Sequence, residues 1–225
     1  LDFVDVQQVE VLRGPQGTLY GKNTTAGALN ITTRKPSFTF EGRAEATYGN
    51  LNFVQLKGSV SGPIVADKVA ARISGSFSKR DGTLYNVVTD RRVNEIDNIG
   101  VRGQILWEAT ENLDITLSGD WNRQDPEGFA QNYVKVVPTA RAATRQFANL
   151  ARLSNYAPAS TDPFDRLVDA DSVLSAKNTI AGVSLLANWD FGPATLTSIT
   201  AWRKWDWVPS NDRDFTGLPI TPLVN

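Results

Sequence analysis

The chain has 225 residues, 41% of them hydrophobic and 21% charged, and a formal net charge of −1. This composition excludes an intrinsically disordered chain, and the near-neutral charge gives no general attraction to nucleic acid. Cysteine and histidine are both absent, which removes disulfides, the usual zinc sites and nucleophile systems built on Cys or His. Catalysis by paired carboxylates stays open, but we predict that the chain is not an enzyme.

The start of the chain carries no targeting signal, because Leu1-Asp2-Phe3 opens neither a charged nor an apolar signal-peptide region. No apolar run approaches the ~18–20 residues that a transmembrane helix needs. The chain begins within a β-like pattern and without methionine, so we expect it to be a piece of a longer protein.

Residues 1–36 are rich in turns. Two β-like runs, Val9–Leu12 and Ala28–Thr33, flank a glycine-rich stretch. The Gly-Lys pair at 21–22 suggests a phosphate-binding loop, but that motif needs glycine and Ser or Thr where the chain has Gln16 and Asn23. The spacing therefore argues against a nucleotide site.

From residue 40 onward, hydrophobic residues alternate with polar ones, which is typical of strands with one apolar face. We predict seven such strands, at 40–49, 54–62, 69–78, 99–107, 113–121, 179–190 and 194–205. Runs of about ten residues suit a tilted crossing of a bilayer better than a soluble sheet. In the seventh run Leu196, Ile199 and Trp202 do not share one face, so we expect a β-bulge there.

The connections between these runs alternate in length. Tight turns follow the second, fourth and sixth runs, and long polar connections follow the third and fifth, the longer of which could hold a short helix at 139–154. Short turns at one rim and long loops at the other are typical of an outer-membrane β-barrel. Large aromatic residues at both strand ends suggest interfacial girdles: Tyr48, Phe77, Trp107, Trp121 and Trp189. A soluble β-sandwich, with the apolar faces in a dry core, is the alternative.

Residues 9–36 read VEVLRGPQGTLYGKNTTAGALNITTRKP, which closely resembles the end of the plug domain of TonB-dependent outer-membrane receptors. The alternating runs follow this motif as the first barrel strands do in that family. One departure is Ala26, where family members often have glycine. The resemblance implies an all-β fold: a transmembrane antiparallel β-barrel of about 22 strands, of which this chain supplies about seven. It divides the chain into the C-terminal part of a plug domain, 1–36, and the N-terminal part of the barrel, 37–225, with outer loops at about 79–97, 125–177 and 207–225.

The resemblance also implies TonB-dependent active import of a scarce ligand across the bacterial outer membrane, a ferric siderophore or similar iron complex. Carbohydrate, vitamin B12 and haem are alternative cargoes, and a passive porin is an alternative that the plug motif disfavours. The implied partners are outer-membrane lipid, a small ligand such as a metal chelate, and TonB, which would contact a region outside this chain. No cofactor, resident metal or nucleic acid is expected.

Two groups of site residues follow. By the resemblance, the plug motif would shape and gate the plug through Arg13, Gly14, Pro15, Gly17, Tyr20, Gly21 and Asn30. Arg13 would pair with carboxylates of the barrel wall, although a solvated turn arginine is the alternative. In the loops, aromatic and arginine side chains could stack on a ligand or attract an anionic chelate: Phe129, Tyr133, Arg141, Arg145, Arg152, Tyr156 and Trp207. The acidic residues at 162–171 lack the spacing of an EF-hand, so we predict no metal there.

Overall fold

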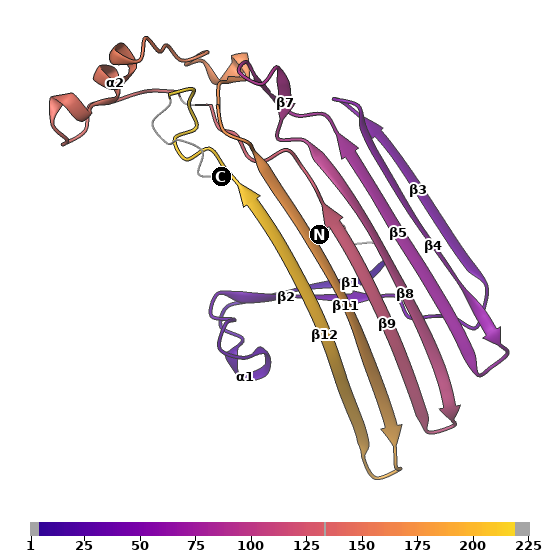
Figure 1. Ribbon diagram of the computed structural model, residues 1–225. Coiled ribbons are helices and arrows are strands. Elements are labelled where there is room, and N and C mark those ends of the chain that lie inside the picture. The colour runs from indigo at the N-terminus through magenta and orange to yellow at the C-terminus, as the bar shows by residue number, and fades with distance from the viewer. Residues whose placement is uncertain (1–4, 133, 219–225) are drawn as a thin grey trace.

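Seven long antiparallel strands form one curved sheet in the computed structural model, which describes residues 5–132 and 134–218 (Figure 1). Their order across the sheet is β12-β11-β9-β8-β5-β4-β3. Their bounds are β3 Glu41–Gly49, β4 Phe53–Val65, β5 Val69–Arg80, β8 Ile96–Thr110, β9 Leu113–Gln124, β11 Ser175–Asp190 and β12 Thr195–Ser210. The seven predicted runs are therefore confirmed as strands, and the all-β class is confirmed as a partial sheet rather than a closed barrel.

The two faces of the sheet have opposite polarity, and on β5, β8 and β9 the polar face is the buried one. On the polar face Arg72, Gln104 and Ser118 pair side by side across three strands and are only 5%, 6% and 7% exposed. On the other face Ile73 and Val183 are each 54% exposed. This is the reverse of a water-soluble protein, in which apolar side chains are buried and polar ones face solvent. The arrangement favours a sheet whose outer face meets hydrocarbon and disfavours the soluble sandwich.

The seventh long strand corrects two of the sequence predictions. β12 pairs with β11 without interruption from Ser175↔Ser210 to Asp190↔Thr195, so the expected bulge is absent. The strand keeps its phase and instead places Ile199 on the polar face, opposite Leu186. β12 also continues past position 207 to Ser210, so the last loop begins later than predicted. Residues 219–225 of that loop lie outside the described residues.

The connections differ in length between the two ends of the sheet. Those at one end are short, at 66–68, 111–112 and 191–194, and those at the other are 50–52, 81–95 and 125–174. The alternation predicted from the sequence is thus present, with the first connection short as well. Among the described residues, no helix is long and apolar enough to cross a membrane.

The two long connections pack into one small unit beyond the end of the sheet. β6 (Leu84–Asn86), β7 (Arg91–Val93) and β10 (Leu167–Val168) form a three-stranded sheet, in which β10 runs parallel to β6. Val93, Ala130 and Val168 form its buried core. The side-chain amide of Asn94 donates to the Ala130 carbonyl oxygen at 3.0 Å and accepts from the Ala130 amide at 2.8 Å. The sequence predicted two long polar connections without indicating any contact between them, yet these contacts fix the two together.

The helix predicted at 139–154 is shorter than expected. The structure has a 3₁₀ turn, η1 (Ala143–Arg145), followed by α2 (Phe147–Leu153), and a second 3₁₀ turn, η2 (Pro163–Asp165). The break between η1 and α2 falls at Gln146, whose backbone is extended.

Gly82→Ala is expected to loosen the loop unit. A Cβ at position 82 would lie 2.3 Å from the backbone oxygen and 2.5 Å from the backbone nitrogen of Val93, so backbone must move, at a cost of about 1–3 kcal/mol. Hydrogen exchange of the β6 and β7 amides in the purified protein should increase. Gly103→Ala is the matched control, because a Cβ there meets nothing within 4 Å. Equal exchange in both variants would contradict the close packing.

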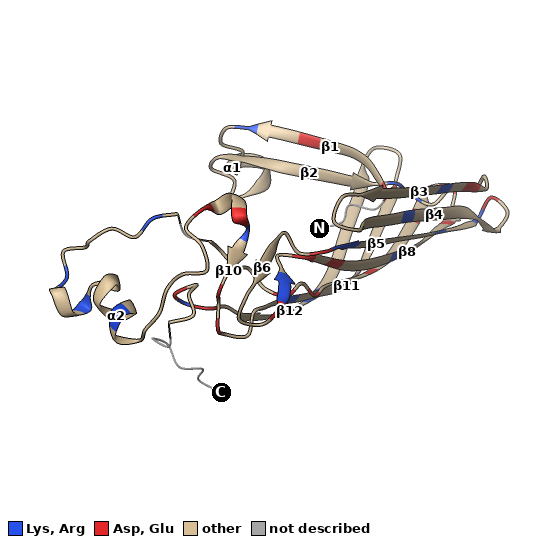
Figure 2. Ribbon diagram, turned by 90° about the horizontal axis from the view of Figure 1, so that it is seen from above, with Lys and Arg blue, Asp and Glu red and all other residues tan. Residues whose placement is uncertain are grey.

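A separate hairpin lies across the concave polar face of the sheet (Figures 1 and 2). It consists of β1 (Val6–Arg13) and β2 (Gly27–Thr33), which contain the two runs predicted from the sequence, joined through a short helix, α1 (Gly17–Tyr20). Gly27 has φ +151°, and a Cβ there would lie 2.5 Å from the Leu12 carbonyl oxygen. Only glycine therefore fits where β2 begins beside the end of β1.

Candidate functional site

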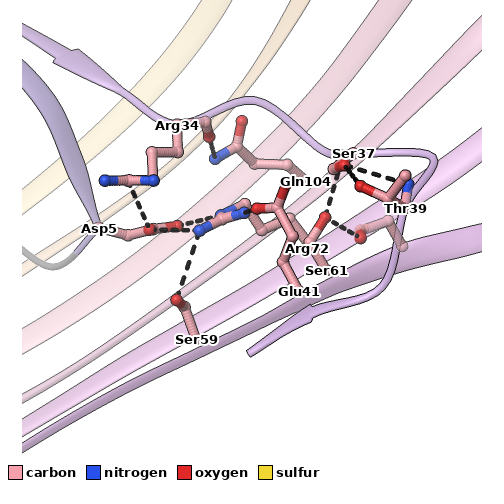
Figure 3. A network of polar contacts seen from close by, with 10 residues as sticks. Asp5, Arg34, Ser37, Thr39, Glu41, Ser59, Ser61, Arg72 and Gln104 are labelled. Atoms are coloured by element: carbon pink, nitrogen blue, oxygen red, sulfur yellow. Dashed lines mark hydrogen bonds and ion pairs between the residues drawn. The ribbon is translucent and has the colours of Figure 1, made fainter. Parts of the chain in front are cut away.

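The base of the hairpin is joined to the sheet by a buried ion pair. The Asp5 carboxylate, just before β1, accepts hydrogen bonds from Nε and Nη2 of Arg72 on β5, the latter at 2.6 Å (Figure 3). The two side chains are 2% and 5% exposed. Glu41 and Ser59 lie 3.4 Å from the same guanidinium, on Nη1 and Nη2. A bidentate pair with so little solvent fixes both the position and the orientation of the chain entering the hairpin.

A few neutral hydrogen bonds complete this junction. Nε2 of Gln104 donates to the Arg34 carbonyl oxygen at 3.1 Å, and the Ser37 amide donates to Oγ of Ser61 at 2.8 Å. The Arg34 amide donates to the Asp5 carbonyl oxygen at 3.0 Å, which ties the two ends of the hairpin together. Among the described residues, hydrogen bonds and ion pairs link the hairpin region to the sheet only through Asp5, Arg34 and Ser37. The hairpin is thus held at its base.

Neither member of the ion pair was among the predicted site residues. The signal for Arg72 is present in the sequence, because it is a charged residue within the strand that shares its face with three serines, at 74, 76 and 78. Its partner could not be chosen in advance, since Asp5 is 67 residues away. The arginine that was predicted, Arg13, is exposed at the end of β1 and forms no ion pair with a described residue. Its pairing with wall carboxylates therefore stays a prediction.

The other residues of the plug motif lie along the hairpin and its tip. Gly14 and Gly21 have φ of +79° and +85°, a region that glycine occupies without strain. Pro15 follows the first of these, while Gly17 and Tyr20 bound α1. On the strands, Nδ2 of Asn30 donates to the Glu10 carboxylate at 2.6 Å across the directly opposed pair. The shaping and gating roles of these residues both stay predictions.

The predicted ligand-facing residues are not gathered into one pocket. Phe129, Arg141 and Arg145 are exposed on the 125–174 connection. Tyr156 is half-buried: its hydroxyl donates to Asp169 at 2.5 Å, and its ring meets Phe147 edge-on at 6.1 Å between centroids. It thus helps to hold the loop together. Tyr133 lies outside the described residues.

Trp207 lies on the polar face of β12 as one half of an aromatic pair. Its ring is stacked on Trp205, with centroids 6.0 Å apart and planes at 9°. Nε1 of Trp205 donates to Oδ1 of Asn178 at 2.6 Å, which fixes the pair against β11. Both rings are more than half exposed. Sequence reasoning missed Trp205 because the phase of this strand was misjudged.

Charged groups lie beside the aromatic pair on the same face. Nη2 of Arg203 donates to Oδ1 of Asp120 at 2.7 Å, and Nη1 of Arg102 donates to the same oxygen at 3.3 Å. Nε of Arg102 is buried without a hydrogen-bond partner among the described residues. Two guanidiniums therefore share one carboxylate, and a flat indole surface lies next to an excess of positive charge.

The acidic residues near the end of β12 fasten the loops. The buried Asp212 carboxylate accepts from the backbone amides of Asp171, Asp214 and Phe215 at 3.0, 3.1 and 2.9 Å. Burial raises the pKa of the Asp214 carboxyl, and the neighbouring Asp212 reinforces this. No group of three or more His, Cys, Asp or Glu residues in the described part of the chain is arranged to hold a metal ion.

Comparisons with known proteins give the same picture from sequence and from fold. The chain is 32% identical to the pesticin receptor of Yersinia pestis over 177 residues, 79% of this chain and 25% of that protein. It is 29% identical to the ferrioxamine B receptor of Salmonella typhimurium over 124 residues, 55% of this chain and 16% of that protein. The chain thus spans a quarter or less of these relatives. No protein-family model matches it.

Solved structures share the fold. The ferric yersiniabactin uptake receptor FyuA from Yersinia pestis superimposes with a TM-score of 0.72 at 20% identity, covering 93% of this chain and 30% of that one. The ferric-catecholate import receptor Fiu from E. coli K12 gives 0.67 at 20% identity, covering 90% and 29%. A third relative was found by sequence. It is the probable TonB-dependent siderophore receptor PirA of Acinetobacter baumannii, which is 26% identical over 132 residues, 53% of this chain and 17% of that protein. The plug-like motif, the strand pattern and these matches identify the chain as a segment of the family of TonB-dependent receptors of the bacterial outer membrane.

Proposed function

We propose that the protein containing this chain imports a ferric siderophore or a similar iron complex across the outer membrane, using energy delivered by TonB. The observation that carries this is the hairpin, held on the polar face of a wall whose other face suits lipid. Because the hairpin lies on the inner face of the wall, it must move before cargo can pass along that face. The names of the relatives, receptors for ferrioxamine B and ferric yersiniabactin, support an iron chelate as cargo. Because the relatives are receptors, we propose no catalytic role.

In this proposal residues 1–36 form the end of the plug and residues 37–225 the first part of the barrel. The base of the hairpin supports a boundary here, because Ser37 is the last residue before β3 that bonds to the wall from this side. Outer loops then occupy 81–95, 125–174 and the residues after Ser210. Lipid contacts the apolar face, and TonB contacts a region outside this chain.

The mechanism requires the hairpin to leave the wall while the wall stays folded. The seven long strands are paired in one continuous sheet, whereas among the described residues hydrogen bonds and ion pairs attach the hairpin region through Asp5, Arg34 and Ser37. Elements with few buried contacts open at lower free energy than a continuous sheet. A pull transmitted through the plug would therefore open the junction at Asp5 before it disturbed the strands. Arg13 and the turn glycines would act within this movable element.

The test is uptake of ⁵⁵Fe-labelled chelates by the source bacterium under iron limitation, using ferric yersiniabactin, ferrioxamine B and ferric enterobactin as probes. We expect at least one to accumulate in wild-type cells and to be lost on deletion of either the receptor gene or TonB. Receptor-dependent uptake that persists without TonB would indicate a passive porin instead. Receptor-dependent uptake of haem, vitamin B12 or a carbohydrate, with no iron chelate taken up, would favour the alternative cargoes.

Trp205→Ala and Trp207→Ala are expected to weaken binding of the imported chelate by roughly 2- to 10-fold each, the effect of losing one aromatic contact. Trp202→Ala is the matched control, because it lies on the same strand but pairs with Val183 on the opposite face. Equilibrium binding to the purified full-length receptor measures the difference. An equal loss in all three variants would point to a general destabilisation of β12 rather than a ligand contact.

A further inference from the structure

The long outer connection contains a stretch of unbalanced positive charge. Residues 128–161, here called the basic excursion, contain Lys135, Arg141, Arg145 and Arg152 and no Asp or Glu, although the whole chain has a net charge of −1. All four side chains are exposed. Within the described residues none of the four forms an ion pair, whereas arginines elsewhere, such as Arg72 and Arg203, do.

The excursion is held in a defined shape by its own backbone contacts. Oε1 of Gln146 accepts from the Thr139 amide at 2.9 Å, and its Nε2 donates to the carbonyl oxygens of Thr139 and Arg141 at 2.8 and 2.6 Å. This bracket closes residues 139–146 without using the guanidinium of Arg141 or Arg145. Neither guanidinium has a hydrogen-bonding partner among the described residues. The hydrogen bonds of Gln146 thus hold the backbone in shape, while the guanidinium groups of Arg141 and Arg145 face solvent.

A second surplus of positive charge lies on the polar face of the wall. Arg102 and Arg203 share the single carboxylate of Asp120, and Nε of Arg102 is a buried donor without a partner among the described residues. This pair lies beside the stacked rings of Trp205 and Trp207. The excursion and this group on the wall both carry more positive than negative charge, so both are suited to an anionic ligand.

We propose that the cargo is a polyanionic ferric chelate with planar aromatic donor groups, of the tris-catecholate type, captured by the basic excursion and then seated against Trp205, Trp207 and Arg203. This rests on the proposed import function and specifies its substrate class. Free charges on an exposed loop raise the rate of encounter with an oppositely charged ligand. The guanidinium and indole groups on the wall then slow its release. Lys135 lies in the same stretch and contributes to the field.

The experiment measures association and dissociation rates of three ferric complexes with the purified full-length receptor: an anionic tris-catecholate, a neutral tris-hydroxamate and a cationic tris-hydroxamate that carries a free amine. Rates are taken at low and high NaCl. For the tris-catecholate we expect the association rate to fall steeply with salt, because the ions screen the field of the excursion. The triple variant R141Q/R145Q/R152Q should reduce that rate about tenfold at low salt and flatten its salt dependence, with dissociation unchanged.

Two controls separate charge from structure. R141K/R145K/R152K keeps the charge and should keep the association rate. K22Q/K35Q/K68Q removes the same charge from exposed lysines outside the excursion and should have little effect. R203Q should act differently and speed dissociation.

A wild-type receptor that binds the neutral or the cationic complex best, with salt-independent association, would overturn this inference. TonB-dependent uptake of that complex by the same cells would leave the import function standing. A receptor that imports no ferric chelate would overturn both.

Discussion

Arg72→Ala is expected to release the hairpin from the wall while the seven-stranded sheet stays folded. The substitution leaves the Asp5 carboxylate, 2% exposed, without its bidentate partner. Removing one member of a buried pair costs about 3–5 kcal/mol, and we expect the lower part of that range because Arg34 still lies 3.9 Å from the Asp5 carboxylate. Hydrogen exchange on the full-length receptor in detergent should show lost protection at Val6–Arg13 and Gly27–Thr33. Amides of β4, β5 and β8 should keep theirs.

Two further variants make this result specific. Arg43→Ala removes an arginine that is 68% exposed and 3.8 Å from Glu45, and such exposed pairs contribute about 0–1 kcal/mol. The double variant Asp5→Leu/Arg72→Met replaces both charges with apolar groups and should recover much of the protection, since no buried charge is left alone. If hydrogen exchange of the hairpin amides were unchanged in Arg72→Ala, the ion pair would not be what holds the hairpin on the wall.

The strands could be predicted from the sequence because their signal is local. In β8, for example, Val101, Gly103 and Ile105 alternate with polar residues, and the structure places them on one face. The plug-like segment could be recognised because its motif is contiguous. Both depend on neighbours in the chain, and neither requires knowledge of distant contacts.

The junction and the loop unit could not be predicted, because both depend on contacts between distant segments. Asp5 and Arg72 are 67 residues apart, and β10 reaches β6 across a separation of about 80 residues that no local pattern records. The phase of β12 was misjudged for a different reason. Leu196 and Trp202 lie on the apolar face with Val183, whereas Ile199 lies on the polar face. Because Ile199 is an apolar residue on the polar face, it interrupts the alternation of polar and apolar residues although the strand itself is regular. The predicted bulge was therefore wrong.

The polar face differs in character between β5 and β12. Where the hairpin rests, near Arg72, the face is made of charged and hydroxyl groups that bond to it directly. Near Trp205 it carries exposed indole rings that no described residue covers. A surface that only had to line water would not need those rings. The polar face thus differs between the junction at Arg72, which bonds to the hairpin, and the surface at Trp205, which we propose binds the ligand.

Val183→Arg is expected to prevent stable insertion of the barrel, whereas Ser184→Arg, one residue further along the same strand, is expected to be tolerated. Val183 lies near the middle of β11 on the apolar face and is 54% exposed, while Ser184 faces the polar side opposite Ser118 and Ala201. An arginine facing lipid at mid-depth costs about 2–4 kcal/mol, and one facing a polar lumen avoids that cost. The amount of receptor in purified outer membranes, with its resistance to SDS before heating, measures insertion. Similar losses in both variants would refute the assignment of faces, because the two substitutions introduce the same residue at adjacent positions on opposite sides of the sheet.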